Sequence, residues 1–402
     1  MINKLISSLF ISVFVVKHLS QAITMVMIGF KLPYLAFIAL ITFIFNIKYI
    51  FKKITITKKQ LYVFILTTIF YLLIINNLNY DYDIFIEKSD GLLKNGFIYL
   101  FISFMIILLK ELPDEEYFKK IIKFFIVLFL VYAIYKVYLF NEEYPLNSIW
   151  IFSYFHSYFS FFKMPSEIIE IDALRVESIR SGRLAGIFLL YAILFTNFSK
   201  IIKLLFFFSL LLLMILIGNR GSVVVVLFIL FIFINKKYIL GLTLILIYII
   251  LALTLKYDIL MIINDTIFSG KFQGLGSSER LITWQTALYN IDTVGFFGNG
   301  IGGFYELIVP GKGHVDYPHN IGLEIFYELG YIAFFIYLFT IYLLIKKAFI
   351  YDQLIFIEKF LYISSIYYIL VAQLSGNMYM NINSFSFIIM FFLIHYNRKR
   401  PI

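Results

Sequence analysis

The 402-residue chain is 62% hydrophobic, 20% aromatic and only 14% charged. Soluble domains carry roughly 25% charged residues, so this composition excludes an ordinary soluble protein and indicates a polytopic membrane protein. The net charge of +10 does not indicate nucleic-acid binding, because most lysines lie in short clusters between apolar runs, as membrane insertion requires. Cysteine is absent, which excludes a disulfide framework and a thiolate metal site.

Apolar runs of bilayer-crossing length recur along the whole chain. They lie at residues 5–27, 33–51, 60–76, 91–109, 121–140, 184–199, 202–217, 222–235, 238–255, 319–345, 360–375 and 382–396. We therefore predict an all-α polytopic protein of about twelve transmembrane helices, forming a single integral membrane domain over residues 1–402. The first run lacks a small-residue cleavage site and is predicted to be an uncleaved span.

Lysine and arginine residues gather in alternate connectors of this arrangement. By the positive-inside rule, these connectors and both termini face the cytoplasm. Two long connectors, at about 141–183 and 256–318, then lie outside. Loops of this length usually have a function of their own, so we expect the functional site on this side.

Four arginines lie on the outer side in this topology: Arg180, Arg183, Arg220 and Arg280. A guanidinium keeps its charge and grips phosphate through two parallel hydrogen bonds, so several arginines converging at a membrane surface suit a pyrophosphate. Arg220 is the strongest candidate for this binding role, because it lies in a short connector between two apolar runs, where a cation usually has a partner. The alternative is that Arg220 reaches lipid headgroups or pairs with a loop carboxylate.

His319 follows Pro318 at the start of the 319–345 run. A histidine at the membrane surface can accept a proton from an alcohol or hold a substrate oxygen. His314 is the competitor for this role, and a purely structural role at the helix start is the plain alternative. Two histidines with Asp316 between them are too few ligands to predict a metal site.

Glu324 and Glu328 are i, i+4 neighbours within the same apolar run. Ionisable groups inside a span face the bundle interior or a wet cavity and are functional candidates, although Glu328 could equally pair with a neighbouring helix. The glycines from Gly298 to Gly303 lack the flanking strand and helix of a nucleotide-binding fingerprint, so we predict a tight turn and no nucleotide cofactor.

In these segments the chain resembles the bacterial O-antigen polymerase and O-antigen ligase family of membrane glycosyltransferases. The resemblance rests on Ser278-x-Arg280-x-x-x-Trp284, on GNGIGGF from Gly298 to Phe304, and on HNIGLEIFYELG from His319 to Gly330. Upstream, Asn219-Arg220-Gly221 is similar to the family's Ser-Arg-Gly element, with Asn in place of the commoner Ser, and Arg183-Leu-Ala-Gly186 is similar to its outer Arg-x-x-Gly element. The matching segments cover about 150 residues and keep the family's order.

The resemblance implies an enzyme of the inner membrane that works without metal or cofactor at the periplasmic face. Its donor would be an oligosaccharide linked to undecaprenyl pyrophosphate. Arg220, Arg280 and Arg183 would hold the pyrophosphate, and His319 would be the candidate catalytic base. Arg180, Glu324 and His314 are further candidates for substrate binding. A chain-length regulator and membrane lipids would be its partners.

Two activities within the family and one outside it remain open. A polymerase joins repeat units, whereas a ligase transfers the finished chain to lipid A–core. We favour the polymerase, because the outer loops mix acidic and basic residues where a ligase would need a basic surface for core phosphates. The alternative from another class is a flippase or transporter for the same lipid-linked sugars, but the sequence shows no related halves, which such proteins usually have.

Overall fold

The computed structural model describes residues 2–15, 56–79, 83–109, 113–143, 182–216, 220–233, 287–304, 318, 320–374, 378–381 and 383–398. Within these ranges the chain is mostly helical and contains no strand, which confirms the all-α class. The chain divides into two compact units, one formed by Met1–Tyr138 with Asp292–Ile402 and the other by Leu139–Ile291. We describe each unit by itself.

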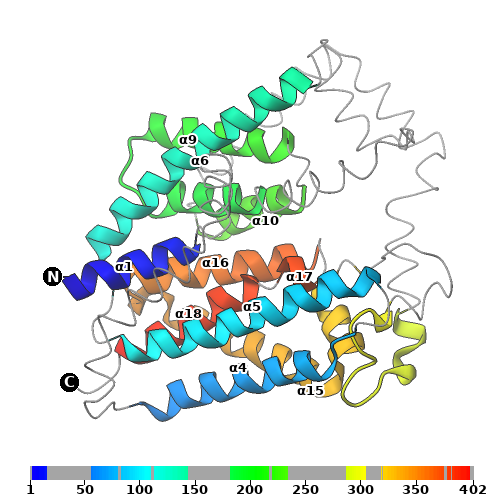
Figure 1. Ribbon diagram of the computed structural model, residues 1–402. Coiled ribbons are helices and arrows are strands. Elements are labelled where there is room, and N and C mark those ends of the chain that lie inside the picture. The colour runs from blue at the N-terminus through cyan, green and yellow to red at the C-terminus, as the bar shows by residue number, and fades with distance from the viewer. Residues whose placement is uncertain are drawn as a thin grey trace. The chain divides into compact units, whose positions relative to one another are not determined.

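Unit 1 contains most of the described helices (Figure 1). They are α1 (Ile2–Val15), α4 (Lys58–Asn76), α5 (Asp83–Leu108), the larger part of α6 (Glu115–Glu143), α15 (Ile321–Lys346), the 3-10 helix η3 (Lys347–Gln353), α16 (Phe356–Ala372), α17 (Met378–Asn381) and α18 (Asn383–Arg398). Successive helices alternate in direction: α4 runs toward the segment 292–304, whereas α5 and α15 run away from it (Figure 1). Unit 1 is therefore a helical bundle with two distinct ends.

A capping residue stands at the start of both α4 and α15. Thr57 accepts a hydrogen bond from the Gln60 amide over 3.2 Å, and the Gln60 side chain accepts one from the Thr57 amide over 3.1 Å. This reciprocal pair is a capping box that satisfies orphan amides at the start of α4. Asn320 accepts from the Leu323 amide over 3.1 Å at the start of α15.

The core of unit 1 lies between α16 and α18. Aromatic side chains interlock there, with ring centroids 4.9 Å apart for Tyr368 and Phe387 and 5.4 Å apart for Tyr362 and Phe391. By contrast, α4 exposes an apolar stripe of Leu61, Ile65, Ile69, Leu72 and Ile75. A large exposed apolar stripe is what a lipid-facing helix presents.

A polar cluster lies at the opposite end of α16 and α18 from the segment 292–304. Glu358 is fully buried and its carboxylate lies 3.2 Å from both Nδ1 of His395 and a guanidinium nitrogen of Arg398. Nε2 of His395 lies 3.1 Å from Nζ of Lys347. These contacts hold η3, α16 and α18 together where α15 ends.

Unit 2 contains the helix Gly182–Leu194, α9 (Lys200–Leu216) and α10 (Arg220–Phe233). Nζ of Lys203 donates to the carbonyl of Ile193 over 2.8 Å, which ties α9 back to the preceding helix. Within the described residues the expected runs 202–217 and 222–235 are helical, whereas the run 184–199 is helical only as far as Leu194 and residues 195–199 are not.

The described residues contain fewer candidate membrane spans than the sequence predicts for the whole chain. Two stretches are long and apolar enough to cross a bilayer, Lys58–Asn76 and Ile321–Gln353, among the residues that the structure describes. The expected spans 33–51 and 238–255 lie outside those residues. The structure therefore does not confirm about twelve spans, and the larger topology stays a prediction.

Candidate functional site

Three charged side chains meet in the interior of unit 1. Nζ of Lys88, on α5, lies 2.5 Å from Oε1 of Glu324 and 2.5 Å from Oε1 of Glu328, both on α15. Lys88 is 7% exposed, Glu324 0% and Glu328 2%. We call these three residues the buried charge cluster. With all three ionised the cluster carries a net charge of −1 in an apolar surrounding.

The second carboxylate oxygen of each glutamate adds a desolvation free energy to the cluster. Oε2 of Glu324 and Oε2 of Glu328 are buried and have no hydrogen-bond partner among the described residues. Removing a charged group from water costs several kcal/mol unless its hydrogen bonds are replaced (about 3–5 kcal/mol for a broken buried pair). A buried ion cluster in a membrane protein is a candidate functional element for this reason.

Burial and charge act in opposite directions on Lys88, which precedes the expected 91–109 span. Burial by itself would lower the pKa of its ammonium, but the charges of Glu324 and Glu328 and the hydrogen bonds to them outweigh burial and raise that pKa. Lys88 therefore stays protonated and acts as the fixed cation that holds the two glutamates together.

A turn of residues 295–304, which we call the glycine turn, is attached to this cluster. The amide of Gly302 donates to Oε1 of Glu328 over 3.0 Å, and the amide of Asn299 donates to the carbonyl of Tyr327 over 2.9 Å. The turn also binds the end of α4, where the amide of Ile301 donates to the carbonyl of Asn77 over 2.7 Å. The prediction of a tight turn at the glycines is confirmed.

Glycine is required at two facing positions of this contact. Gly298 has φ of 95° and Gly330 has φ of 80°, a region that side chains strongly disfavour. A Cβ at Gly298 would collide with the carbonyl of Glu328, and a Cβ at Gly330 would collide with the amide of Gly298. The turn and α15 thus approach each other backbone to backbone.

Gly330 also divides α15 into two pieces. Its backbone is not helical, so the residues from Ile321 to Leu329 form a short first piece and those after Gly330 a longer second piece. The first piece carries Glu324 and Glu328, which bind Lys88 and the amide of Gly302.

Asn77 connects the end of α4 to the glycine turn. Its side-chain amide donates to the carbonyl of Leu73 and to the carbonyl of Phe297, each over 2.8 Å. Together with its own carbonyl bonded to Ile301, Asn77 makes the end of α4 and the glycine turn one hydrogen-bonded unit.

The predicted site residues are only partly brought together. Glu324 lies in the buried charge cluster. Arg183 is buried in unit 2, and Arg220 is the first residue of α10 in the same unit, so neither belongs to the unit that holds the cluster. His319, His314, Arg280 and Arg180 lie outside the described residues.

Lys88 was missed by the sequence reasoning. The expected span began at residue 91, whereas α5 begins at Asp83 and includes Lys88 in its second turn. The signal was available: a lysine just ahead of an apolar run, in a chain that also places two carboxylates one turn apart within another run. The pairing of Glu328 with a neighbouring helix, left open from the sequence, is what the structure has.

The comparisons with known proteins found no matching family model, no matching curated protein and no matching solved structure. The arrangement itself is a rigid polar junction, in which three helices and a glycine turn are joined by buried hydrogen bonds and charges. Asn320, the cap of α15, stands at the start of the helix piece that this junction holds.

Proposed function

We propose that the protein is a membrane glycosyltransferase that joins oligosaccharide repeat units carried on undecaprenyl pyrophosphate, that is, an O-antigen polymerase. The observation that carries the proposal is the contact between two segments of the sequence resemblance. The stretch from Gly298 to Phe304 and the stretch from His319 to Gly330 meet through Gly302 and Glu328. This contact supports the proposal, because it brings together two of the segments on which the resemblance rests.

The proposed catalytic residue, His319, is next to the junction in the sequence. His319 lies one residue before Asn320, which caps the first piece of α15. That piece is locked by the buried charge cluster, and catalytic groups need such fixed supports to hold reacting atoms in place. In the proposed mechanism, His319 accepts the proton of an acceptor sugar hydroxyl while Arg220, Arg280 and Arg183 stabilise the leaving pyrophosphate.

The direction of the helices supports the proposed topology. The junction lies at the end of the bundle where α4 ends and α15 begins (Figure 1), which is the outer side when the lysine-bearing connectors face the cytoplasm. We therefore propose an inner-membrane protein with both termini in the cytoplasm and about twelve spans, and a site open to the periplasm. A chain-length regulator is a proposed partner.

A transporter of the same lipid-linked sugars is the second candidate function. Discontinuous helices and buried ionisable clusters are frequent in transporters, and α15 is broken at Gly330 beside such a cluster. A ligase that transfers the chain to lipid A–core is the alternative within the same family.

The polysaccharide ladder of cells lacking the protein separates these functions. Loss of long chains with lipid A–core still carrying one repeat unit is expected for a polymerase. Bare core with polymer accumulating on its carrier lipid would instead identify a ligase. Repeat units accumulating on the cytoplasmic side would identify a transporter. Complementation with the wild-type chain should restore the ladder in each case.

A further inference from the structure

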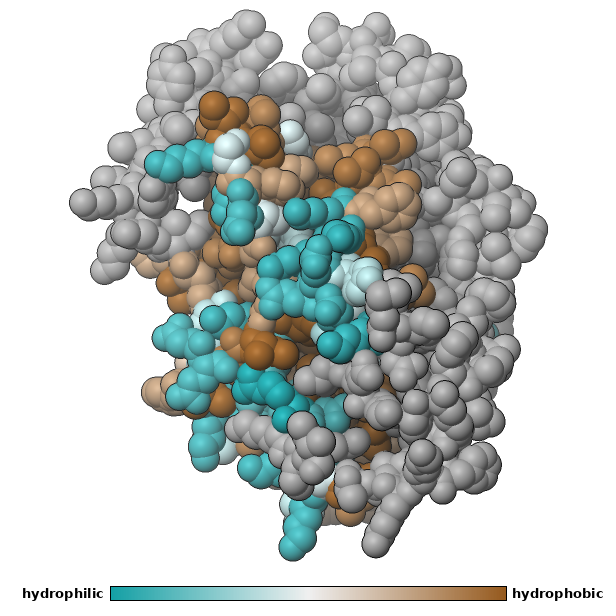
Figure 2. All heavy atoms as spheres, turned by 90° about the vertical axis from the view of Figure 1, so that its left-hand side faces the viewer, coloured by the Kyte–Doolittle hydropathy of each residue, from teal (hydrophilic) through white to brown (hydrophobic). Residues whose placement is uncertain are grey.

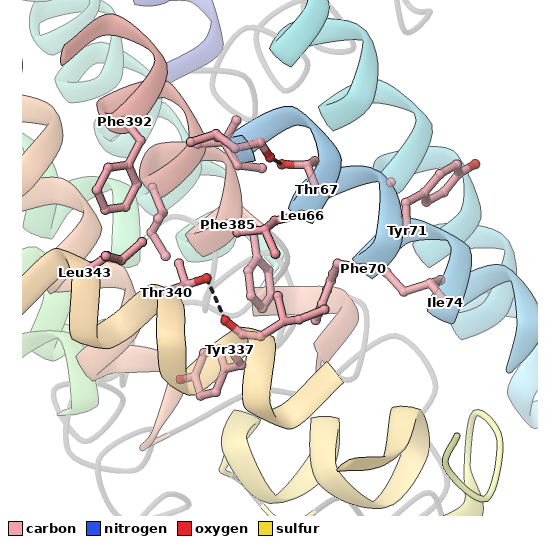
Figure 3. A pocket seen from close by; sticks show the side chains of 15 residues that line it. Leu66, Thr67, Phe70, Tyr71, Ile74, Tyr337, Thr340, Leu343, Phe385 and Phe392 are labelled. Atoms are coloured by element: carbon pink, nitrogen blue, oxygen red, sulfur yellow. Dashed lines mark hydrogen bonds between the residues drawn. The ribbon is translucent and has the colours of Figure 1, made fainter. Parts of the chain in front are cut away.

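A half-open apolar groove lies between α4, α15 and α18 (Figure 3). Its lining includes Val63 and Phe70 from α4, Leu343 from α15, and Phe385 and Phe392 from α18. The side chains point into a common space (Figure 3), and the hydroxyl of Thr340 within it is already bonded to its own helix, at the carbonyl of Ile336. The groove therefore presents apolar surface to whatever occupies it.

The groove has the length of one membrane leaflet. On α4 its lining extends from Val63 to Ile74, which is about 16 Å at the helical rise of 1.5 Å per residue. Half of a hydrocarbon core of about 30 Å is about 15 Å. An acyl chain of one leaflet thus matches the groove in length as well as in polarity.

One end of the groove is cationic. Nζ of Lys59 lies 5.7 Å from the centre of the Tyr396 ring, and Nζ of Lys347 lies 5.4 Å from the same centre. Both lysines thus approach a single aromatic ring, and Lys59 is exposed. Lys347 also contacts Nε2 of His395 over 3.1 Å. Two ammonium groups beside the same ring give this end of the groove a positive charge that attracts a phosphate group.

The cationic end continues the groove on all three helices. Lys59 precedes Val63 by four residues on α4, Lys347 follows Leu343 by four residues at the end of α15, and Tyr396 follows Phe392 by four residues on α18. Residues four apart lie on the same face of a helix, one turn from each other. We call Lys59, Lys347 and Tyr396 the charged rim. Each of them lies one turn beyond a residue that lines the groove.

Hydrophilic residues occur on this side of the molecule. Figure 2 views the molecule from the side where α4 begins and α18 ends, and it shows hydrophilic side chains beside hydrophobic ones. The nearby carboxylate of Glu358 is buried and already bonded to Arg398 and His395, so it does not oppose an incoming anion. A headgroup at the rim would meet water on one side and lysines on the other.

We propose that this groove and rim bind one anionic phospholipid, with an acyl chain between α4, α15 and α18 and its phosphate between Lys59 and Lys347. The charged rim of this site lies at the opposite end of the bundle from the buried charge cluster, and the apolar groove extends from the rim to Ile74, about one turn before Asn77. The site is independent of the sugar chemistry proposed above, and it places the lipid in the leaflet that the lysine-bearing connectors face.

Native mass spectrometry of the detergent-purified full chain tests this site, with phosphatidylglycerol and phosphatidylcholine added in turn. We expect one phosphatidylglycerol to bind about tenfold or more tightly than phosphatidylcholine. Lys59→Ala combined with Lys347→Ala should remove that preference. The matched control combines Lys58→Ala with Lys346→Ala, which removes the same charge from the adjacent exposed residues and should keep it.

Two single variants keep the test decisive if the double variant is unstable. Thr340→Phe fills the groove without touching the lysines and should weaken binding of both lipids. Lys59→Ala should weaken phosphatidylglycerol alone, by about fivefold to tenfold for one lysine at a membrane surface. Equal phosphatidylglycerol binding by Lys59→Ala and Lys58→Ala, or undiminished binding by Thr340→Phe, would overturn the proposal.

Discussion

The backbone amide of Gly302 donates a hydrogen bond over 3.0 Å to the same oxygen of Glu328 that lies 2.5 Å from Nζ of Lys88. One carboxylate oxygen thereby joins a loop, the first piece of α15 and α5. An ionised carboxylate accepts hydrogen bonds and donates none. The contacts to Gly302 and Lys88 therefore depend on Glu328 staying ionised, or on a replacement that keeps an acceptor oxygen at the same place. The predictions below follow from that dependence and from the groups around it.

Replacing Lys88 removes the single cation of the cluster. Lys88→Met leaves Glu324 and Glu328 buried and unpaired, so we expect a loss of about 3–5 kcal/mol in the free energy of unfolding, measured by denaturation in mixed micelles. The control is Lys94→Met on the same helix, whose partner Asp90 is exposed, with an expected loss of about 0–1 kcal/mol. Equal losses for the two variants would mean that the cluster does not stabilise the fold.

The glycine turn should be more sensitive at Gly298 than at Gly300, although both have positive φ. A Cβ at Gly298 collides with the backbone of Glu328, whereas the nearest atom to a Cβ at Gly300 is the Asn77 carbonyl at 3.7 Å. Gly300→Ala therefore bears conformational strain alone, about 1–2 kcal/mol, and Gly298→Ala adds the collision. Comparing their unfolding curves checks this order, and a larger loss for Gly300→Ala would contradict the backbone contact.

Asn77 should control how firmly the glycine turn is held. Asn77→Ala removes the side-chain bonds to Leu73 and Phe297, so we expect faster amide exchange throughout residues 297–301. The effect should be about 1–3 kcal/mol in local opening free energy. Thr68→Ala is the control, because Thr68 bonds only its own helix at the carbonyl of Phe64. Unchanged exchange in Asn77→Ala would show that the turn is held by other contacts.

The proposed chemistry assigns different outcomes to two sets of variants. Arg220→Ala and Arg280→Ala should abolish long polysaccharide chains while leaving membrane insertion intact, because they would lose contacts to the pyrophosphate. His319→Ala should do the same. Lys94→Ala, an exposed cation on α5, should leave the ladder unchanged. Normal chains from both arginine variants would refute the assignment of the pyrophosphate site.

Much of the helical architecture followed from the spacing of apolar runs. The runs at 60–76 and 382–396 correspond to α4 and α18 within a few residues, because a continuous apolar segment has few alternatives to a helix in a membrane. The glycine turn was also predictable, since several glycines within a few residues are typical of backbone with positive φ.

The buried charge cluster was only half predictable. Glu324 and Glu328 were recognised because carboxylates within an apolar run are rare, but their partner Lys88 is far away in the sequence, and helix pairing is a tertiary property. The break at Gly330 was missed for the same reason. Its non-helical backbone accompanies the close approach of the glycine turn, which the sequence around α15 does not encode by itself.

The most direct test is reconstitution of the purified chain in vesicles with an undecaprenyl-pyrophosphate-linked repeat unit as the only sugar source. We expect products with two or more repeat units and stoichiometric release of undecaprenyl pyrophosphate, both lost in Arg280→Ala. Movement of the intact donor across the bilayer with no new glycosidic bond would contradict the glycosyltransferase function and identify a transporter instead.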